Sequence, residues 1–278
     1  MAMTESSSTK EHERRLRAEV WDRSTEYYRI ARDGTLATYQ DNEAYRMALA
    51  ALAGCSAMLD VGCGEGTTLA LARPRVAVGC DLSRTALGMA RRQYPQLALT
   101  CGDAAALPFR TGTLPAVGSF FAVEHFAEPE RMLAELVRVV APDGKLVVCG
   151  PNYGSPINRN PYWREHRHRY FVRRLWQCLR LLGHDGSTLA WEKNTPEFLR
   201  SGSVVTECDV LTNPYLGSLL TFLTARDMRI ECYTAGWSWD RGREPLLQKL
   251  LRLLAALRLP PFTWCGPVFC VVARKRRA

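Results

Sequence analysis

A turn built on three alternating glycines is the feature that most constrains this chain. Gly62, Gly64 and Gly66 follow the apolar residues 57–61 and precede the helix-forming residues 67–72. Glycine adopts positive φ readily and leaves space beside backbone N–H groups that a Cβ would fill. The N-terminus of the following helix directs its partial positive charge to the same place. The segment therefore predicts a strand, a cofactor-binding turn and a helix, with a purely structural turn as the alternative.

Two aspartates follow the next two predicted strands. Asp81 comes directly after the apolar residues 75–80, and Asp103 follows residues 97–101. Because the carboxyl ends of successive parallel strands meet at one edge of a sheet, we expect both carboxylates beside the glycine turn. There Asp81 can accept hydrogen bonds from ribose hydroxyls, and Asp103 can accept one from an exocyclic adenine amine. The alternative is that both aspartates cap the helices that follow them.

Five motifs occur in a fixed order between residues 59 and 152. They read LDVGCGEG, GCDLS, CGDAAALPF, FFAVEHF and APDGKLVVCGPN. In these motifs the chain resembles the class I S-adenosylmethionine-dependent methyltransferases. The resemblance is strongest to the methyltransferase type 11 group, which includes enzymes of ubiquinone and menaquinone biosynthesis. It implies that this chain is an S-adenosylmethionine-dependent methyltransferase.

The resemblance also assigns a cofactor site. In the family, the glycine turn holds the methionine part of S-adenosylmethionine, the acid after the second strand holds the ribose, and the Asp of the GDA motif holds the adenine amine. Cys63, inside the turn, is expected to be a small filler rather than a nucleophile. By position, the cofactor-binding residues are Asp60, Gly62, Cys63, Gly64, Gly66, Asp81, Leu82, Asp103, Ala104 and Phe121.

The fold class follows from the alternation of predicted strands and helices, which indicates a parallel, doubly wound α/β sheet. The resemblance implies a Rossmann-like sheet of seven strands whose last strand is antiparallel. Further predicted elements are a helix at 83–94 with Ser83 as its N-cap, a helix at 129–139, a turn at 142–144, and strands at 145–149 and 268–272. The last strand is wholly apolar, so we expect it to be central.

The segments outside this core are expected to enclose the substrate. We predict a helical cap over residues 1–50 and a methyltransferase domain over residues 51–278. The domain carries a helical insertion after the fifth strand, at residues 151–213, that is a candidate substrate lid. For the cap, packing on the sheet edge is the alternative role. For the insertion, the alternative is an ordinary helical insertion.

Histidine is the side chain best suited to remove a proton near neutral pH. His125 follows the fourth predicted strand, at the sheet edge that faces the transferred methyl, and Glu124 is adjacent. Both are candidate catalytic residues, although this Glu-His pair can equally order the loop. His166, His168 and His184 in the candidate lid are alternative bases.

Composition limits the class of protein. No run of eighteen apolar residues and no secretion signal occurs, so no membrane-spanning segment is expected. The ten cysteines are scattered without a CxxC pair, which indicates reduced thiols and a cytoplasmic location. Their spacing fits neither zinc nor an iron–sulfur cluster, so no metal is expected.

The formal net charge of +9 raises the question of an anionic partner. Arginine alternates with aromatic residues at 160–176, and residues 274–277 are basic. These segments can contact nucleic acid or an anionic membrane surface, although a solvated face is the more common role. Residues 244–259 form a leucine-rich amphipathic helix in which Leu246, Leu250, Leu253, Leu254 and Leu257 share a face. We expect this face to pack on the protein, with membrane-surface binding as the alternative.

The function that fits best is methyl transfer from S-adenosylmethionine to an oxygen or carbon nucleophile of a small organic molecule. A phenolic, quinone-like, lipid or secondary-metabolite acceptor is expected. The alternatives are an RNA or protein methyltransferase and a protein that binds S-adenosylmethionine without turnover. No amine-positioning motif of the Asn-Pro-Pro-Tyr type follows the fourth strand, where AVEH stands instead, and this argues against RNA or protein methylation.

Overall fold

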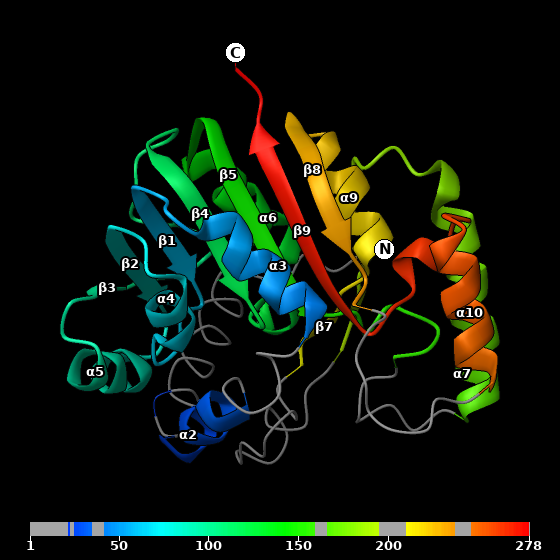
Figure 1. The fold of residues 1–278 in the computed structure, drawn as a ribbon, viewed down its shortest axis with the longest axis horizontal. Coiled ribbons are helices and arrows are strands. Elements are labelled where there is room, and N and C mark those ends of the chain that lie inside the picture. Colours follow the sequence, from blue (N-terminus) through cyan, green and yellow to red (C-terminus); the bar gives the residue numbers. More distant parts are fainter. Residues whose placement is uncertain are drawn as a thin grey trace, which may run out of the picture.

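A seven-stranded sheet forms the centre of the protein (Figure 1). The structure is a computed structural model that describes residues 22, 25–34, 42–158, 166–194, 210–236 and 246–277. The strand order is β3-β2-β1-β4-β5-β9-β8, and β9 is antiparallel to both of its neighbours. This confirms the predicted Rossmann-like sheet with an antiparallel last strand. The strands are β1 (Ala57–Val61), β2 (Val76–Asp81), β3 (Ala98–Cys101), β4 (Leu114–Phe120), β5 (Val140–Pro151), β8 (Met228–Thr234) and β9 (Val268–Lys275).

The register of the parallel strands brings their carboxyl ends to one edge. Val61 pairs with Cys80, and Asp81 pairs with Cys101. The segments that follow β1, β2 and β3 therefore start side by side. This is the edge at which ligands bind in doubly wound sheets, and it is where the sequence motifs converge.

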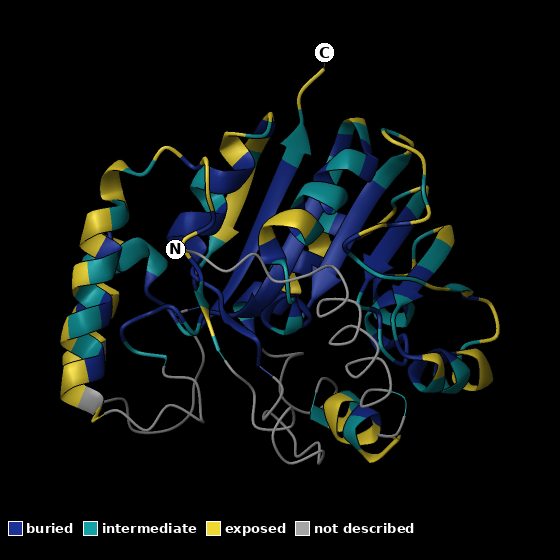
Figure 2. Cartoon of the chain, turned by 180° about the vertical axis from the view of Figure 1, so that it is seen from behind, coloured by how far each residue is buried: buried dark blue, intermediate teal, exposed yellow. Residues whose placement is uncertain are grey.

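Helices cover both faces of the sheet. α3 (Glu43–Leu52), α4 (Thr67–Ala72) and α5 (Arg84–Gln93) share a hydrophobic core with Met58, Val147 and Val272. α6 (Pro129–Val139) and α9 (Leu216–Thr224) share a second core with strand residues one position away, such as Leu59 and Val148. Neighbouring residues of one strand thus serve opposite faces, as the two-residue period of a strand requires. The central strands β1, β4, β5 and β9 are buried along most of their length (Figure 2).

Helix and strand ends follow local chemistry. Ser83 caps α5 by accepting a hydrogen bond from the backbone N–H of Ala86, as predicted. Pro129 occupies the first turn of α6, where its missing N–H costs nothing. The predicted turn at 142–144 does not precede the fifth strand but lies inside it. β5 starts at Val140 and its register with β4 shifts there, so the turn residues form an irregularity within the strand.

The insertion after β5 contains α7 (Arg167–Arg180), a 3₁₀ turn η3 (Leu181–Gly183) and a small sheet of β6 (Glu192–Lys193) and β7 (Thr212–Asn213). The small sheet was not expected from the sequence, because two-residue strands carry no periodic signal. Glu192 of β6 accepts hydrogen bonds from Arg173 and Arg174 of α7. Residues 159–165 and 195–209 of the expected lid lie outside the described residues, as do residues 1–21 of the expected cap.

The leucine-rich helix near the C-terminus differs from the prediction. α10 (Leu246–Ala256) forms, and a 3₁₀ turn η4 (Phe262–Trp264) follows it. The predicted packing face is exposed, however, with Leu246, Leu250, Leu253 and Leu257 at 84, 51, 58 and 62% exposure. Leu251 faces the protein instead and is buried. The interpretation that the leucine face packs is therefore wrong. No described helix is both long and apolar enough to cross a bilayer.

Candidate active site

A cavity of about 200 Å³ lies at the carboxyl edge of the sheet. Its walls come from the glycine turn after β1, the ends of β2 and β3, the segment after β4, and α2 (Thr25–Gly34). Sequence reasoning named most of these segments but no site residue in α2. The described residues that line the cavity include Tyr27, Tyr28, Ala31, Val61, Gly62, Cys63, Gly64, Glu65, Thr67, Thr68, Asp81, Leu82, Asp103, Ala104, Phe121, Ala122, His125, Phe126 and Met132.

All three glycines of the turn have positive φ. Gly62 and Gly64 line the cavity, and a Cβ on Gly62 would lie 2.5 Å from the Cβ of Ala122. Gly66 has a different task. A Cβ there would lie 2.8 Å from Leu97 Cδ1 and 3.4 Å from the Cβ of Ala90 in α5, so glycine at this position allows the start of α4 to approach α5. Gly66 does not line the cavity. The turn thus needs glycine at each position for backbone conformation, for close approach, or for both.

Asp81 connects the end of β2 to the glycine turn. Its Oδ2 accepts a hydrogen bond from the backbone N–H of Gly64 at 2.8 Å, and its Oδ1 accepts one from the N–H of Ser83 at 2.8 Å. Burial raises the pKa of this carboxyl, and these hydrogen bonds oppose the increase. Asp81 lines the cavity, so the carboxylate is held in a fixed orientation while it faces the ligand space.

Asp60 and Glu65 add two more carboxyl groups beside the turn. Asp60 is buried, and its Oδ1 has no hydrogen-bond partner within the described part of the chain. Burial, and then repulsion from Asp81 and Glu65, holds the pKa of Asp60 well above the usual carboxyl range. Burial also raises the pKa of Glu65, although the N–H and hydroxyl of Thr67 donate to it. The cluster therefore favours a cation in its neighbourhood.

The other wall residues complete the ligand space. Asp103 and Ala104 lie after β3, and Oδ1 of Asp103 accepts a hydrogen bond from the N–H of Ala105 at 2.8 Å. Asp103 therefore orders its own turn, as the capping alternative expects, while it also lines the cavity. Leu82 lines the cavity next to Asp81.

Aromatic residues form the remaining wall. Phe121 has a φ of +50°, an uncommon conformation for a bulky residue, and its ring lies 6.2 Å from that of Tyr45 of α3. The hydroxyl of Tyr45 is 3.1 Å from that of Thr68, which lines the cavity. Tyr28 of α2 is buried against the turn. Sequence reasoning missed Tyr28, although the Tyr27–Tyr28 pair in a polar segment was a usable signal.

His125 lines the cavity, as predicted for a candidate base. It lies in a 3₁₀ turn, η2 (Val123–His125), and its Nε2 is 3.8 Å from Oε1 of the buried Glu124. The end of the insertion supports this turn. The N–H of Leu211 donates to the carbonyl of Glu124 at 2.8 Å, and the hydroxyl of Thr212 donates to the carbonyl of Val123.

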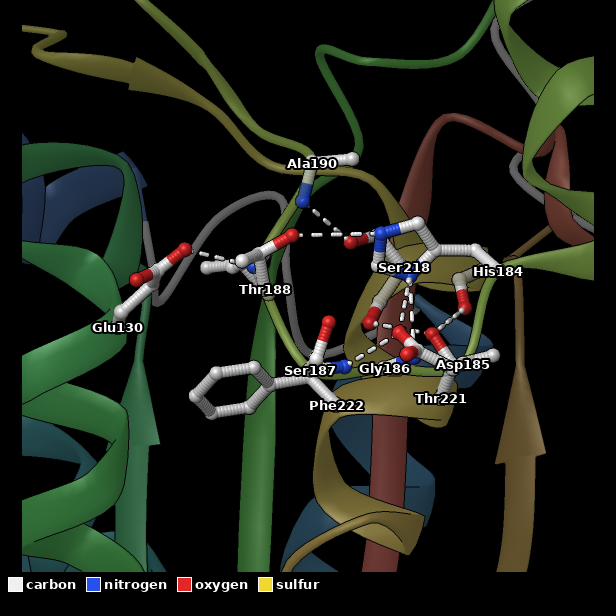
Figure 3. Close-up of polar contacts among 12 residues, drawn as sticks. Glu130, His184, Asp185, Gly186, Ser187, Thr188, Ala190, Ser218, Thr221 and Phe222 are labelled. Carbon is white, nitrogen blue, oxygen red and sulfur yellow. Dashed lines mark hydrogen bonds and ion pairs between the residues drawn. The ribbon is translucent and has the colours of Figure 1, made fainter.

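The alternative histidines do not reach this cavity within the described residues. The rings of His166 and His168 stack on each other at the start of α7, with centroids 5.9 Å apart. His184 belongs to a loop that is held against α6 and α9 (Figure 3). None of the three lines the cavity, so the structure does not bring them to the candidate site.

Figure 3 shows what His184 does instead. Its Nδ1 accepts a hydrogen bond from the N–H of Gly186 at 3.0 Å, and its Nε2 is 3.3 Å from the hydroxyl of Thr188. The same loop is anchored by Glu130, which accepts from the N–H of Leu189, and by a serine of α9, which accepts from the N–H of Ala190. His184 therefore organises a structural loop.

These features fit S-adenosylmethionine. The cofactor carries positive charge on its sulfonium and its ammonium, and the cavity lies beside the carboxyl groups of Asp60, Glu65 and Asp81. Arg32 of α2 interacts electrostatically with Glu65, and no cation is among the causes that shift the pKa of Asp60 or Asp81. The backbone of Gly62 and Gly64 lines the cavity and provides polar contacts at one end, and the buried carboxyl of Asp60 lies beneath this turn. Asp81 and Asp103 provide acceptors for hydroxyl and amine groups further along.

Comparison with known proteins agrees with this assignment. Residues 59–148 match the family described as "Methyltransferase domain". The chain is 38% identical over 103 residues to the tRNA (carboxymethyluridine(34)-5-O)-methyltransferase ALKBH8 of Macaca fascicularis. This match covers 36% of this chain and 15% of that protein. The chain is 37% identical over 94 residues to the demethylmenaquinone methyltransferase of Streptomyces avermitilis, covering 33% of this chain and 41% of that protein. The chain thus spans less than half the length of either relative.

One solved structure has a similar fold over most of this chain. The S-adenosylmethionine-dependent methyltransferase of Mesorhizobium loti superposes with a TM-score of 0.56 and 19% identity, over 84% of this chain and 99% of that one. At this identity the likeness concerns the fold, and the sequence matches concern the motifs of the cofactor site. Together with the sheet order and the geometry of the turn, they identify this chain as carrying the methyltransferase domain of the class I S-adenosylmethionine-dependent methyltransferases.

Proposed function

We propose that this chain transfers a methyl group from S-adenosylmethionine to an oxygen or carbon nucleophile of a small organic molecule. The acceptor class is phenolic, quinone-like, lipid or secondary metabolite. The observation that carries this proposal is the lining of the cavity, which includes the apolar side chains of Phe121, Phe126 and Met132 together with His125. Such a wall suits an apolar or aromatic acceptor with one acidic proton.

The residues of the site have distinct tasks in this reaction. When bound, S-adenosylmethionine supplies an electrophilic methyl group on a positively charged sulfur. Asp81 and Asp103 hold and orient hydroxyl and amine groups, and the aromatic wall excludes water. The imidazole of His125 accepts the proton that the nucleophile of the acceptor loses as its new bond to the methyl carbon forms. Glu124, 3.8 Å away, stabilises the resulting imidazolium.

We also propose that residues 1–50 act as a cap and that the insertion at 151–213 shapes access for the acceptor. The contribution of Tyr27, Tyr28 and Ala31 to the cavity wall supports the cap. The hydrogen bond from Leu211 to the Glu124 carbonyl supports a role for the insertion, because it ties the insertion to the turn that carries His125. A cytoplasmic location is proposed as well, supported by the free thiols of the described cysteines.

RNA is the second candidate acceptor, because one relative is named a tRNA methyltransferase. The part of the arginine-rich stretch that the structure describes gives this candidate little support. Arg173 and Arg174 bind Glu192, and Tyr170 is buried, so these side chains are occupied within the protein. Residues 160–165 of the stretch lie outside the described residues.

The proposal is tested by incubating the full chain with methyl-labelled S-adenosylmethionine and a native extract. The label is expected in a product that organic solvent extracts and that resists both ribonuclease and protease. A His125→Asn variant should transfer far less label, and His184→Asn, which alters a structural loop, should transfer label at the normal level per folded molecule. Label that ribonuclease releases would establish the RNA candidate instead, and absence of label from every fraction would leave a binding protein without turnover.

A further inference from the structure

Two helices present apolar side chains to solvent at one end of the molecule. α7 and α10 lie at the end of the long axis opposite α5 (Figure 1), and exposed residues run along the outer helix there (Figure 2). On α7 the exposed apolar residues are Val172, Trp176 and Leu179. On α10 they are the leucines already described. Single exposed leucines are ordinary, but several exposed apolar residues on one helix can mark an interaction surface.

The exposed residues follow the helical period. Leu246, Leu250, Leu253 and Leu257 are spaced four, three and four positions apart, which aligns them along one side of α10. Val172, Trp176 and Leu179 are spaced four and three positions apart and align in the same way on α7. Each helix therefore carries a continuous apolar stripe, and each stripe faces solvent.

Basic residues border these stripes. Lys249 and Arg252 are exposed on one flank of the α10 leucines, and Arg169 and Arg180 are exposed on α7. Neither helix contains an Asp or Glu. Arg174 is different, because it is buried and bound to Glu192. Each helix thus combines exposed apolar side chains with basic residues and carries a net positive charge of its own.

We propose that α7 and α10 bind the surface of an anionic lipid bilayer, with the helices lying in the plane of the headgroups. We name the exposed stripes of the two helices, with their flanking cations, the α7/α10 face. Leucines and Trp176 enter the boundary between headgroups and acyl chains, and Lys249 and Arg252 remain at the level of the lipid phosphates. The 11 residues of α10 span about 16 Å, about half the hydrocarbon thickness, so the helix lies on the bilayer and does not cross it.

Charge and composition favour a bilayer over a second copy of this chain or a nucleic acid as the partner of the α7/α10 face. A second copy of this chain would bring cations against cations, with no acidic residue on either helix to pair with them. Apart from Trp176, the exposed apolar side chains named on the two helices are aliphatic, and these neither stack on the bases of a nucleic acid nor donate hydrogen bonds. An anionic bilayer complements both parts of the face. This inference stands independently of the proposed methyl acceptor.

The test uses the full chain and vesicles of phosphatidylcholine containing about a quarter phosphatidylglycerol, with pure phosphatidylcholine vesicles alongside. Binding is measured by flotation, and insertion is measured by the emission of Trp176. We expect the protein to float with the anionic vesicles and much less with the neutral ones. The tryptophan emission should shift to the blue and be quenched by brominated lipid, and Trp176→Phe should lose most of this response.

Matched variants locate the contact. Leu253→Ser should weaken vesicle binding about tenfold, whereas Val76→Ser, which changes a similarly exposed residue on β2, should not. Reversing both Lys249 and Arg252 to Glu should weaken binding about twentyfold or more. Reversing Arg91 and Arg92 to Glu is the control, because α5 carries the same change in charge at the opposite end of the molecule.

Three outcomes would overturn the proposal. The first is absence of binding to anionic vesicles by folded protein. The second is binding that Leu253→Ser and the α10 charge reversal leave unchanged while the α5 reversal abolishes it. The third is a dimer in light scattering without lipid that Leu253→Ser converts to a monomer, which would assign the face to a second copy. Thermal melts of all variants verify that each remains folded.

Discussion

The backbone N–H of Gly64 donates a hydrogen bond to Oδ2 of Asp81 at 2.8 Å. This bond joins the two motifs that define the cofactor site, the glycine turn after β1 and the acid at the end of β2. Because the other oxygen of Asp81 accepts from Ser83, the carboxylate is oriented before any ligand arrives. The fold therefore orders part of the site in advance, which lowers the conformational free energy that cofactor binding must supply.

Asp60→Asn should make the cofactor-free protein more stable and bind the cofactor less well. The substitution replaces a buried carboxyl whose Oδ1 lacks a partner within the described residues. It also relieves repulsion from Asp81 and Glu65. Because Asp60 does not line the cavity, its carboxyl acts on the bound cation at a distance, and loss of this attraction should cost about 1–2 kcal/mol, or roughly 5- to 30-fold in Kd. Calorimetry and thermal melts at pH 8 measure both effects, and a lower Tm with unchanged affinity would show that Asp60 serves the fold alone.

Cofactor affinity should fall as the pH is lowered. The pKa values of Asp60, Glu65 and Asp81 are raised by burial, so these groups take up protons at a higher pH than ordinary carboxyls, and a protonated carboxyl attracts a cation less. Titrations of S-adenosylmethionine at several pH values from 8 downward measure the trend. In Asp60→Asn the dependence should be shallower, and an affinity that rises toward acid would contradict the carboxylate cluster.

Stability of the cofactor-free protein should show the opposite trend. A raised pKa means that the folded state binds these protons more tightly than the unfolded chain does. The three groups therefore contribute a decrease in the free energy of unfolding as the pH rises above the ordinary carboxyl range, near 4, toward their raised values. The difference in Tm between wild type and Asp60→Asn, followed over this range, isolates the contribution of one group.

His125→Asn should reduce turnover without reducing cofactor affinity. A positioned general base contributes about 100- to 10,000-fold to rate, and Asn cannot accept a proton. The Kd for S-adenosylhomocysteine should stay within a few-fold of wild type, because His125 makes neither of the hydrogen bonds that orient Asp81 at the glycine turn. Turnover of an identified acceptor gives kcat, with His184→Asn as the control. Unchanged kcat would mean that the Glu124–His125 pair orders the loop and takes no part in proton transfer.

Asn152→Ala should destabilise the protein without touching the cavity. Its Nδ2 donates to the carbonyls of Trp264 and Gly266, and its Oδ1 accepts from the N–H of Leu216. The side chain is fully buried, so removal leaves three backbone groups without this partner, at a cost of about 3 kcal/mol or more. Asn158→Ala, which removes a single bond to the carbonyl of Pro267, should cost less than half as much in denaturant unfolding.

Much of the fold could be predicted because the sequence features that specify it act between residues close together in the chain. Three glycines in one turn, Ser83 as an N-cap and an acid after each of two strands are short-range chemistry, and the structure uses each of them. The prediction that the last strand is antiparallel rested on the family resemblance, because an apolar run in a sequence does not indicate the direction of a strand. Of the predicted cofactor residues, Asp60 and Gly66 lie outside the cavity wall, because one is buried beneath the turn and the other serves helix packing.

Other features depend on tertiary contacts that a sequence pattern does not contain. Tyr28 reaches the cavity because α2 contributes to its wall at the carboxyl edge. The Tyr27–Tyr28 pair draws attention to the segment, but its position against the cavity depends on tertiary packing. Histidine can act as a base, but both ring nitrogens of His184 contact groups of its own loop. The leucine stripe of α10 has the period of a packing face, yet the helix buries Leu251 and leaves the stripe to solvent. Periodicity predicts which residues share one side of a helix, but it does not predict what packs against that side.

The most direct measurement is a calorimetric titration of S-adenosylhomocysteine into wild type, Asp81→Ala and Asp185→Ala. Asp185 is the matched control, because it also orders its own turn by accepting a backbone hydrogen bond, from Ser187, at 2.8 Å, but lies in the His184 loop away from the cavity. The account predicts one site in wild type and in Asp185→Ala, with affinity about 100-fold weaker or lost in Asp81→Ala. No heat with folded wild type, or equal affinity in all three proteins, would contradict it.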